Sequence, residues 1–205
     1  MKWEDLKIEV YTGRAISEHI FEVAEFRIRY FRDFPYLYAG NLGYESEYLA
    51  GYAKDSSSIL VKISDEGGKL LGVSTGLPLA TDADILEGAV EMFVNAGLAP
   101  KDYYYYGEII LDYSIRGHGF SRCVYSLQDS YAHARGFSKV AIATVVRDAG
   151  DPRRPVDMAD AVVVWKGLGF TKTGIEFDYH WPTIESDGAV LDRLNPMVYW
   201  TRGLG

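Results

Sequence analysis

The sequence holds a single cysteine, Cys123, in 205 residues, so no disulfide can form within the chain. No stretch approaches the roughly 18 consecutive apolar residues that a membrane-spanning helix needs. The residues that follow Met1 lack the apolar segment of a secretory signal. These absences predict a globular protein of the reducing cytoplasm and argue against a disulfide-rich secreted fold or a membrane helix.

The chain also lacks an excess of basic residues. Lys and Arg total 21 against 29 Asp and Glu, which gives a formal net charge of −8. A broad nucleic-acid surface requires clustered cations, so we expect no nucleic-acid partner and no membrane partner. Apolar residues make up 48%, and no repeat, low-complexity tract or linker interrupts the sequence. We therefore expect one domain over residues 1–205.

Hydrophobic periodicity predicts strands and helices in alternation. Strands are expected at residues 7–11, 59–64, 69–77, 103–111, 140–146, 171–181 and 197–201. Helices are expected at residues 20–31, 44–53, 82–96 and 120–134, and a further helix is expected between Asp157 and Leu168. Ser17 and Asp157 are the expected N-caps of the first and the last of these helices. This order predicts an α/β protein in which helices flank a mixed sheet.

The most informative segment, residues 115–120, separates a strong predicted strand from a strong predicted helix. Its glycines, Gly117 and Gly119, allow the backbone to approach a ligand closely. The free N–H groups at the start of a helix form an anion site, and Arg116 adds a planar positive charge. The combination predicts a pyrophosphate-binding loop, although a tight turn that needs positive φ at glycine is the alternative. Neither of the common Gly-rich nucleotide motifs is complete here.

The stretch Arg116-Gly117-His118-Gly119-Phe120-Ser121 resembles the Arg/Gln-x-x-Gly-x-Gly/Ala motif of the GNAT superfamily of acyl-CoA-dependent N-acetyltransferases. Ser121 departs from the usual Gly or Ala, and Gly169-Phe170 resembles the pair that ends the family's fourth helix. The resemblance covers about residues 7–202, and several blocks, such as residues 34–38, resemble one bacterial branch of the superfamily. It implies a mixed, mostly antiparallel central sheet of about seven strands, split between strands 4 and 5.

The resemblance further implies acetyl-CoA as co-substrate, with no metal. The pantetheine arm would pair with the strand backbone of Ile109, Ile110 and Leu111. The pyrophosphate would lie beside Arg116 on the backbone of the loop, and this assigns cofactor-binding roles to Gly117, His118, Gly119, Phe120 and Ser121. An amine would then attack the thioester carbonyl directly.

Such a reaction needs a base, and Glu108 is the only carboxylate of residues 103–111. A structural carboxylate paired with a cation is the alternative for this residue. Because side chains alternate along a strand, we expect Glu108 to face away from Leu111, and Tyr105 to share the face of Leu111.

The reaction also needs a proton donor for the leaving thiolate. Many family members have a Tyr five residues before the Phe of the Gly-Phe pair, but this position is Trp165 here. Tyr131, Tyr179 or bulk water could replace it, and we take Tyr179 as the candidate catalytic residue.

For the acceptor, the resemblance implies a pocket walled by the region between the first two helices and by the last hairpin. The candidate substrate-binding residues there are Tyr36, Tyr38, Tyr44, Glu45 and Trp181, together with Arg147 at the end of the fifth strand. An aromatic box with one carboxylate suits an ammonium group. The alternatives are aromatics that merely cover the sheet and an arginine in a surface ion pair.

The sequence thus predicts an enzyme that moves an acetyl group from acetyl-CoA to an amine of a small molecule. Two alternatives stay open: a non-catalytic module that senses acyl-CoA or binds a protein, and an enzyme that acetylates a protein or peptide. The oligomeric state is also open, with a homodimer among the options.

Overall fold

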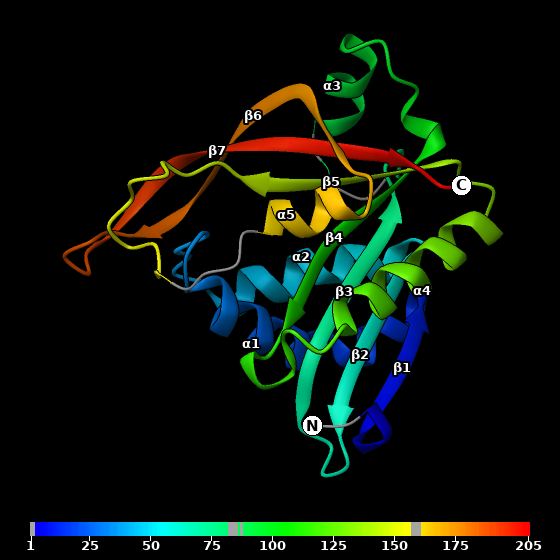
Figure 1. Ribbon diagram of the computed structural model, residues 1–205, viewed down its shortest axis with the longest axis horizontal. Coiled ribbons are helices and arrows are strands. Elements are labelled where there is room, and N and C mark those ends of the chain that lie inside the picture. Colours follow the sequence, from blue (N-terminus) through cyan, green and yellow to red (C-terminus); the bar gives the residue numbers. More distant parts are fainter. Residues whose placement is uncertain (1–2, 82–85, 87, 157–160) are drawn as a thin grey trace.

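The computed structural model describes residues 3–81, 86, 88–156 and 161–205. The described elements follow one another as η1 (Trp3–Asp5), β1 (Leu6–Thr12), η2 (Gly13–His19), α1 (Ile20–Phe31), α2 (Leu42–Lys54), β2 (Ile59–Asp65), β3 (Leu70–Pro78), α3 (Ala89–Asn95), η4 (Pro100–Asp102), β4 (Tyr103–Leu111), η5 (Tyr113–Ile115), α4 (Phe120–Ala134), β5 (Lys139–Val145), α5 (Ala161–Gly167), β6 (Thr171–Ile184) and β7 (Val190–Gly203) (Figure 1).

The strands form one seven-stranded sheet in the order β1-β2-β3-β4-β5-β7-β6. Every neighbouring pair is antiparallel except β4 and β5, which run parallel. The predicted fold class is therefore confirmed: a mixed, mostly antiparallel sheet flanked by helices.

The two central strands pair over only part of their length. Residues 103–106 of β4 pair with residues 139–142 of β5, although β4 continues to Leu111 and β5 to Val145. Beyond this point the strands separate, and in Figure 1 β1–β4 run steeply while β5 and β7 lie nearly horizontal. The predicted split between strands 4 and 5 is confirmed, and it leaves one edge of β4 without a strand partner.

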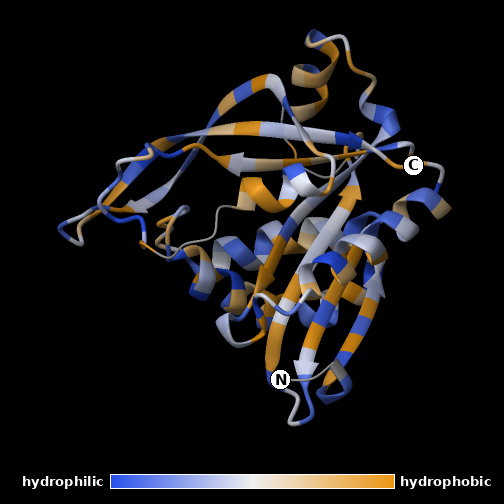
Figure 2. Ribbon diagram, in the orientation of Figure 1, coloured by the Kyte–Doolittle hydropathy of each residue, from blue (hydrophilic) through white to orange (hydrophobic). Residues whose placement is uncertain are grey.

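Helices cover both faces of the sheet. Apolar side chains of α1 and α2, such as Val23 and Leu49, pack with Leu60 and Tyr105 on one face. On the other face, α4 and α5 pack against Tyr106 and its neighbours. The edge strand β1 alternates between hydrophobic and hydrophilic residues, as a strand with one solvated face should (Figure 2).

Two predicted boundaries differ from the structure. Ser17 does not cap α1, because residues 13–19 form a 3-10 helix in which the Ser17 hydroxyl donates to the carbonyl of Arg14. The N-cap of α1 is His19. Part of the helix predicted from residue 82, and the predicted N-cap Asp157, lie outside the described residues; α3 begins at Ala89.

The last hairpin is longer than the sequence predicted. Strands β6 and β7 have 14 residues each and pair from Thr171 and Thr201 to Ile184 and Val190. The predicted strands at residues 171–181 and 197–201 stop short of Pro182 and Pro196. Both prolines lie within the paired strands, where Pro182 pairs with Asp192 and Pro196 pairs with Asp178.

Candidate active site

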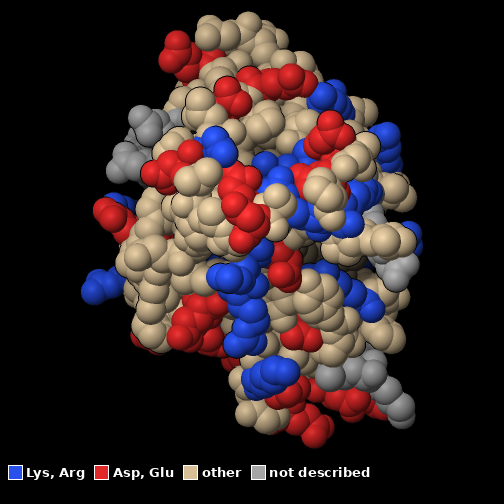
Figure 3. Space-filling view, turned by 90° about the vertical axis from the view of Figure 1, so that its left-hand side faces the viewer, with Lys and Arg blue, Asp and Glu red and all other residues tan. Residues whose placement is uncertain are grey.

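A cleft of about 1060 Å³ opens where β4 and β5 separate. Its walls are β4, β5, α5, the loop before α4 and the segment after α1. Among the described lining residues, five are basic (Arg116, Arg122, Arg147, Arg154 and Lys172) and two are acidic (Asp33 and Glu108). A cleft with this balance in a chain of net charge −8 favours an anionic ligand. Basic side chains, interspersed with acidic ones, also gather across the middle of the face in Figure 3.

The glycine loop lies at one end of this cleft. Gly117 and Gly119 have φ values of 79° and 86°, in the left-handed region where a side chain is strained. The backbone N–H groups of Gly117, His118, Gly119 and Ser121 donate no hydrogen bond within the described part of the chain. Donors of this kind at the N-terminus of a 15-residue helix are the groups that an anion-binding site requires.

Arg116 is held at the cleft by its neighbours. Its Nε atom donates to the Leu111 carbonyl over 2.8 Å, and its guanidinium lies 4.0 Å from the ring centre of Tyr113. The Tyr113 hydroxyl donates in turn to Asp33 at the end of α1. Nη1 and Nη2 of Arg116 donate none of the hydrogen bonds found among the described residues, so its fork is available to an anion.

A bulge at Gly107 shapes the strand at the point where the sheet splits. Thr75 of β3 pairs with Glu108 and Gly76 pairs with Tyr106, which leaves Gly107 unpaired. A Cβ at Gly107 would overlap the hydroxyl of Tyr52, so only glycine fits.

The bulge corrects one prediction. Leu111 packs beside Phe120 on the α4 face, whereas Tyr105 packs with Ile110 on the α1–α2 face. The extra residue reverses the alternation, so Tyr105 does not share the face of Leu111. Glu108 does face away from Leu111, as expected, because it contacts α1.

Glu108 belongs to a buried charge triad. The Arg27 guanidinium of α1 donates through Nη1 to Glu108 and through Nε to Glu45 of α2. All three residues are less than 10% exposed. Burial alone would lower the pKa of Arg27, but the charges of Glu108 and Glu45 raise it well above its usual value. The triad therefore places one cation between two carboxyl groups in the interior of the protein.

One oxygen of the triad is left for a ligand. Glu108 Oε2 accepts from Arg27, but Oε1 is buried and has no hydrogen-bond partner. Glu108 also lines the cleft, and the partly buried rings of Phe31 and Tyr36 line it nearby. An unpartnered buried carboxylate oxygen is costly unless a ligand supplies a donor. This geometry suits a carboxylate that accepts a proton from an amine.

Two of the predicted acceptor residues, Tyr36 and Arg147, line the cleft, and Trp181 packs behind them. Arg147 donates from Nε to the Pro35 carbonyl over 2.7 Å and from Nη2 to the Tyr36 carbonyl over 3.0 Å. Trp181 donates to the same Tyr36 carbonyl over 3.1 Å. Arg147 and Trp181 thus hold the wall that carries Tyr36.

The other predicted acceptor residues lie apart from the described cleft lining. Glu45 is engaged by Arg27, and Tyr38 is buried beside Val145 and Trp181. The hydroxyls of Tyr44 and Tyr179 lie 3.1 Å apart, each on a half-exposed side chain. The structure therefore brings neither Tyr179, the predicted proton donor, nor Tyr44 to the lining of the cleft.

Sequence reasoning missed two residues. Arg27 looked like an ordinary helix residue, although it falls on the buried face of α1 with Ala24 and Tyr30, at positions i−3 and i+3. Tyr125 of α4 lines the cleft and accepts a hydrogen bond from Trp165. The remaining proposed donor, Tyr131, gives its hydroxyl hydrogen to the Ser58 carbonyl.

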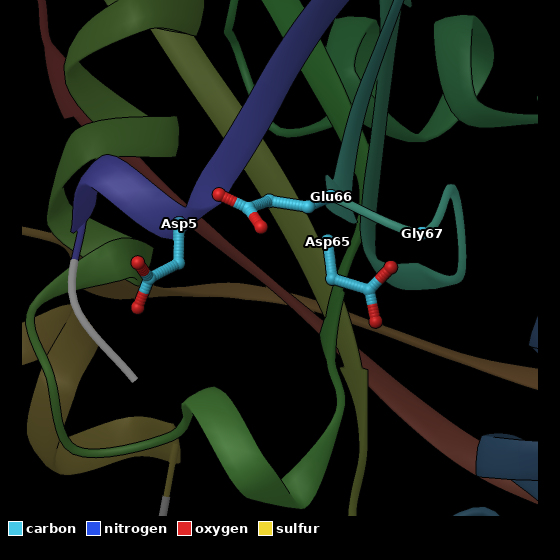
Figure 4. A pocket seen from close by; sticks show the side chains of 4 residues that line it. All are labelled: Asp5, Asp65, Glu66 and Gly67. Atoms are coloured by element: carbon cyan, nitrogen blue, oxygen red, sulfur yellow. The ribbon is translucent and has the colours of Figure 1, made fainter.

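A second hollow lies at the turn of the β2–β3 hairpin and is lined by Asp5, Asp65, Glu66 and Gly67 (Figure 4). The Asp65 carboxylate accepts from the Lys69 N–H of its own turn, which is a structural role. Within the described ranges, no group of three or more His, Cys, Asp or Glu side chains could hold a metal ion. None of the described helices is both long and apolar enough to cross a membrane.

No protein-family model matches the chain, and no curated protein matches its sequence. Solved structures do match. An acetyltransferase of the GNAT family from Streptococcus pneumoniae is 13% identical with a TM-score of 0.57, over 97% of this chain and 100% of that one. A Salmonella typhimurium protein, solved with acetyl-CoA as its cofactor, is 11% identical with a TM-score of 0.55, over 98% and 95%. The ribosomal-protein-S18-alanine N-acetyltransferase of Escherichia coli is 9% identical with a TM-score of 0.54, over 97% and 95%.

Proposed function

The chain has the fold of the GNAT acetyltransferases, and we propose that it is an acetyl-CoA-dependent N-acetyltransferase that acts on an amine of a small molecule. One observation carries the proposal. The anion-binding loop and the unpartnered oxygen of Glu108 open into the same cleft, at the point where β4 and β5 separate. A phosphate site and a base within one cleft are what transfer from a phosphorylated acyl carrier to an amine requires.

The cleft offers matching groups for each part of acetyl-CoA. The diphosphate fits the free N–H groups of residues 117–119 and 121 and the free fork of Arg116. The pantetheine amides fit the edge of β4 at Ile109 to Leu111, which β5 leaves unpaired. A polar chain that lies along an unpaired edge gains backbone hydrogen bonds without a specific side chain. Acetyl-CoA supplies the activated acetyl group.

Glu108 is the proposed base. The amine enters from the α1–α2 face of the sheet, where Oε1 accepts a proton from its nitrogen. Arg27 holds the other oxygen in place, so the carboxylate cannot turn away. The rings of Phe31 and Tyr36 favour an ammonium-bearing acceptor.

Two features support a small acceptor over a protein. The wall at Pro35 and Tyr36 is fixed by Arg147 and Trp181 rather than open as a groove. The base itself is 8% exposed, so a narrow primary amine reaches it more easily than a folded chain does.

The direct test is release of CoA thiol from acetyl-CoA in the presence of amine panels: aliphatic diamines, amino sugars, amino acids, and peptides with free N-termini. We expect turnover with one of the small-molecule classes, and loss of most of it in Glu108→Gln. Turnover with peptides alone would favour the protein-acetylating alternative. Tight acetyl-CoA binding without turnover on any panel would favour the non-catalytic module.

A further inference from the structure

A hydrogen bond joins α4 and α5 in the wall of the cleft. The indole Nε1 of Trp165 donates to the hydroxyl oxygen of Tyr125 over 2.6 Å. Both residues line the cleft. Tyr125 is 6% exposed, and its ring packs between those of Tyr106 and Phe170 at centroid distances of 6.1 and 6.2 Å. The hydroxyl is therefore held in a fixed position.

The hydrogen of this hydroxyl has no acceptor. An indole nitrogen can only donate, so the Tyr125 oxygen is the acceptor in its bond with Trp165. No acceptor for the Tyr125 hydrogen is found among the described residues, although buried donors are normally paired. A ligand in the cleft is what this hydrogen can reach.

Tyr125 and Glu108 lie on opposite sides of the gap between β4 and β5, which indicates what the Tyr125 hydroxyl could do. Tyr106, against which Tyr125 packs, is the last residue of β4 that pairs with β5. Tyr125 lies on the α4–α5 face of the sheet, and Glu108 contacts α1 on the opposite face. A group that reacts in the gap between the strands would meet the base on one side and the Tyr125 hydroxyl on the other.

We propose that Tyr125 is the hydrogen-bond donor to the leaving sulfur of CoA and that Trp165 is its positioning residue. The inference rests on the proposed acetyl transfer. As the amine nitrogen bonds to the acetyl carbon, the carbon–sulfur bond breaks and the sulfur keeps the electron pair. The sulfur leaves as a thiolate that accepts a hydrogen bond from the Tyr125 hydroxyl, which keeps its proton. The nitrogen gives its proton to Glu108, and solvent removes that proton and protonates the thiolate as CoA departs.

The environment keeps Tyr125 in the donating form. Burial raises the pKa of Tyr125, and the hydrogen bond from Trp165 opposes this shift only in part. The phenol is therefore protonated at neutral pH. A donor beside the sulfur stabilises the thiolate form, so it should lower the pKa of the CoA thiol in the complex.

The test uses CoA itself and needs no known acceptor. The ultraviolet absorbance of the thiolate gives the thiol pKa of bound CoA as a function of pH. We expect Tyr125→Phe to raise that pKa by about one unit with the dissociation constant of CoA changed less than about threefold, because one hydrogen bond to a charged atom is lost. Trp165→Phe should raise it by a smaller amount.

Tyr103→Phe is the matched control. It removes a buried tyrosine hydroxyl from β4 on the other face of the sheet and should leave the thiol pKa unchanged. With an active amine in hand, Tyr125→Phe should lower kcat about 10- to 100-fold and leave the KM for acetyl-CoA within about twofold.

The outcomes separate the two claims. Normal CoA binding with the same thiol pKa in wild type and Tyr125→Phe would overturn the role of Tyr125 and leave acetyl transfer standing. Failure of the wild type to bind CoA would overturn the proposed function and this inference with it. If Tyr125→Phe does not fold, Trp165→Phe decides, since an unchanged thiol pKa in that variant contradicts the proposal.

Discussion

The two ends of the cleft are built in different ways. At the loop end, the anion site consists of consecutive residues, 116–121, and its donors are backbone N–H groups. At the amine end, the charge triad draws Arg27, Glu45 and Glu108 from α1, α2 and β4, and its groups are side chains. The loop end is therefore defined by local conformation, whereas the amine end exists only after the sheet and both helices have packed.

This contrast has an energetic consequence. The loop leaves its polar groups facing an open cleft, where water satisfies them, so they cost little stability. The triad is buried, and each member depends on the others for its hydrogen bonds. Substitutions at the amine end should therefore change stability strongly, and substitutions at the loop end should change affinity with little effect on folding.

The largest expected effect is on stability, in Arg27→Met. Removing the cation leaves Glu45 and Glu108 buried together without a partner, which should cost about 3–5 kcal/mol in the free energy of unfolding. Urea denaturation measures it. Arg29→Met, two residues along α1 on an exposed side chain, is the control and should stay within about 0.5 kcal/mol. Equal losses of unfolding free energy in the two variants would contradict the claim that the amine end depends on its buried charges for stability.

The next effect is on turnover, in Glu108→Gln. Loss of the base should lower kcat at least about 100-fold. Glu45→Gln is the matched variant, because it removes the other carboxylate from Arg27 and leaves Glu108 Oε1 in the cleft. It should destabilise the protein comparably but lower kcat less than about tenfold. Similar kcat values in the two variants would show that the triad acts through structure alone.

At the loop end, Arg116→Glu should raise the dissociation constant of acetyl-CoA at least about tenfold and leave stability nearly unchanged, because the exposed fork meets the diphosphate directly. Calorimetric titration gives the affinity. Arg135→Glu, just beyond the other end of α4, makes the same change in net charge and should not alter binding. Weakened binding in both variants would point to a general charge effect rather than a site.

The smallest effect concerns acid stability at Asp112, which follows β4. Burial would raise the pKa of Asp112, but hydrogen bonds from Ser114 and Tyr30 lower it to about 2. Because the folded pKa lies below the unfolded value of about 3.9, this stabilisation is present above pH 4 and is lost as the pH falls toward 2. In Asp112→Asn the stability should therefore fall less between pH 7 and pH 3 than in the wild type, as measured by the urea midpoints at the two pH values. An unchanged acid limb would contradict the assignment.

The conformation of the loop end was predictable from the sequence because every part of it is local. Two glycines at positive φ, an arginine and a helix start are adjacent in the chain, and their geometry follows from their own backbone. The seven strands were also predictable, because each carries its own hydrophobic pattern.

The amine end was not predictable in the same way. Glu108 and Glu45 were both identified, but neither local pattern indicates that Arg27 joins them across 18 and 81 positions. The bulge at Gly107 depends on the Tyr52 hydroxyl of α2, so strand alternation alone gave the wrong face for Tyr105. The role proposed for the Tyr125 hydroxyl depends on its hydrogen bond with Trp165 of α5, which lies 40 positions away and which no local pattern indicates.

The central claim is that one cleft holds a phosphorylated acyl carrier by its diphosphate and by its extended arm. Calorimetric titration with acetyl-CoA, and with ADP for comparison, tests it most directly. The account predicts micromolar binding of acetyl-CoA and much weaker binding of ADP, because ADP reaches the loop but not the free edge of β4. Absence of acetyl-CoA binding, or equal affinity for the two ligands, would contradict it.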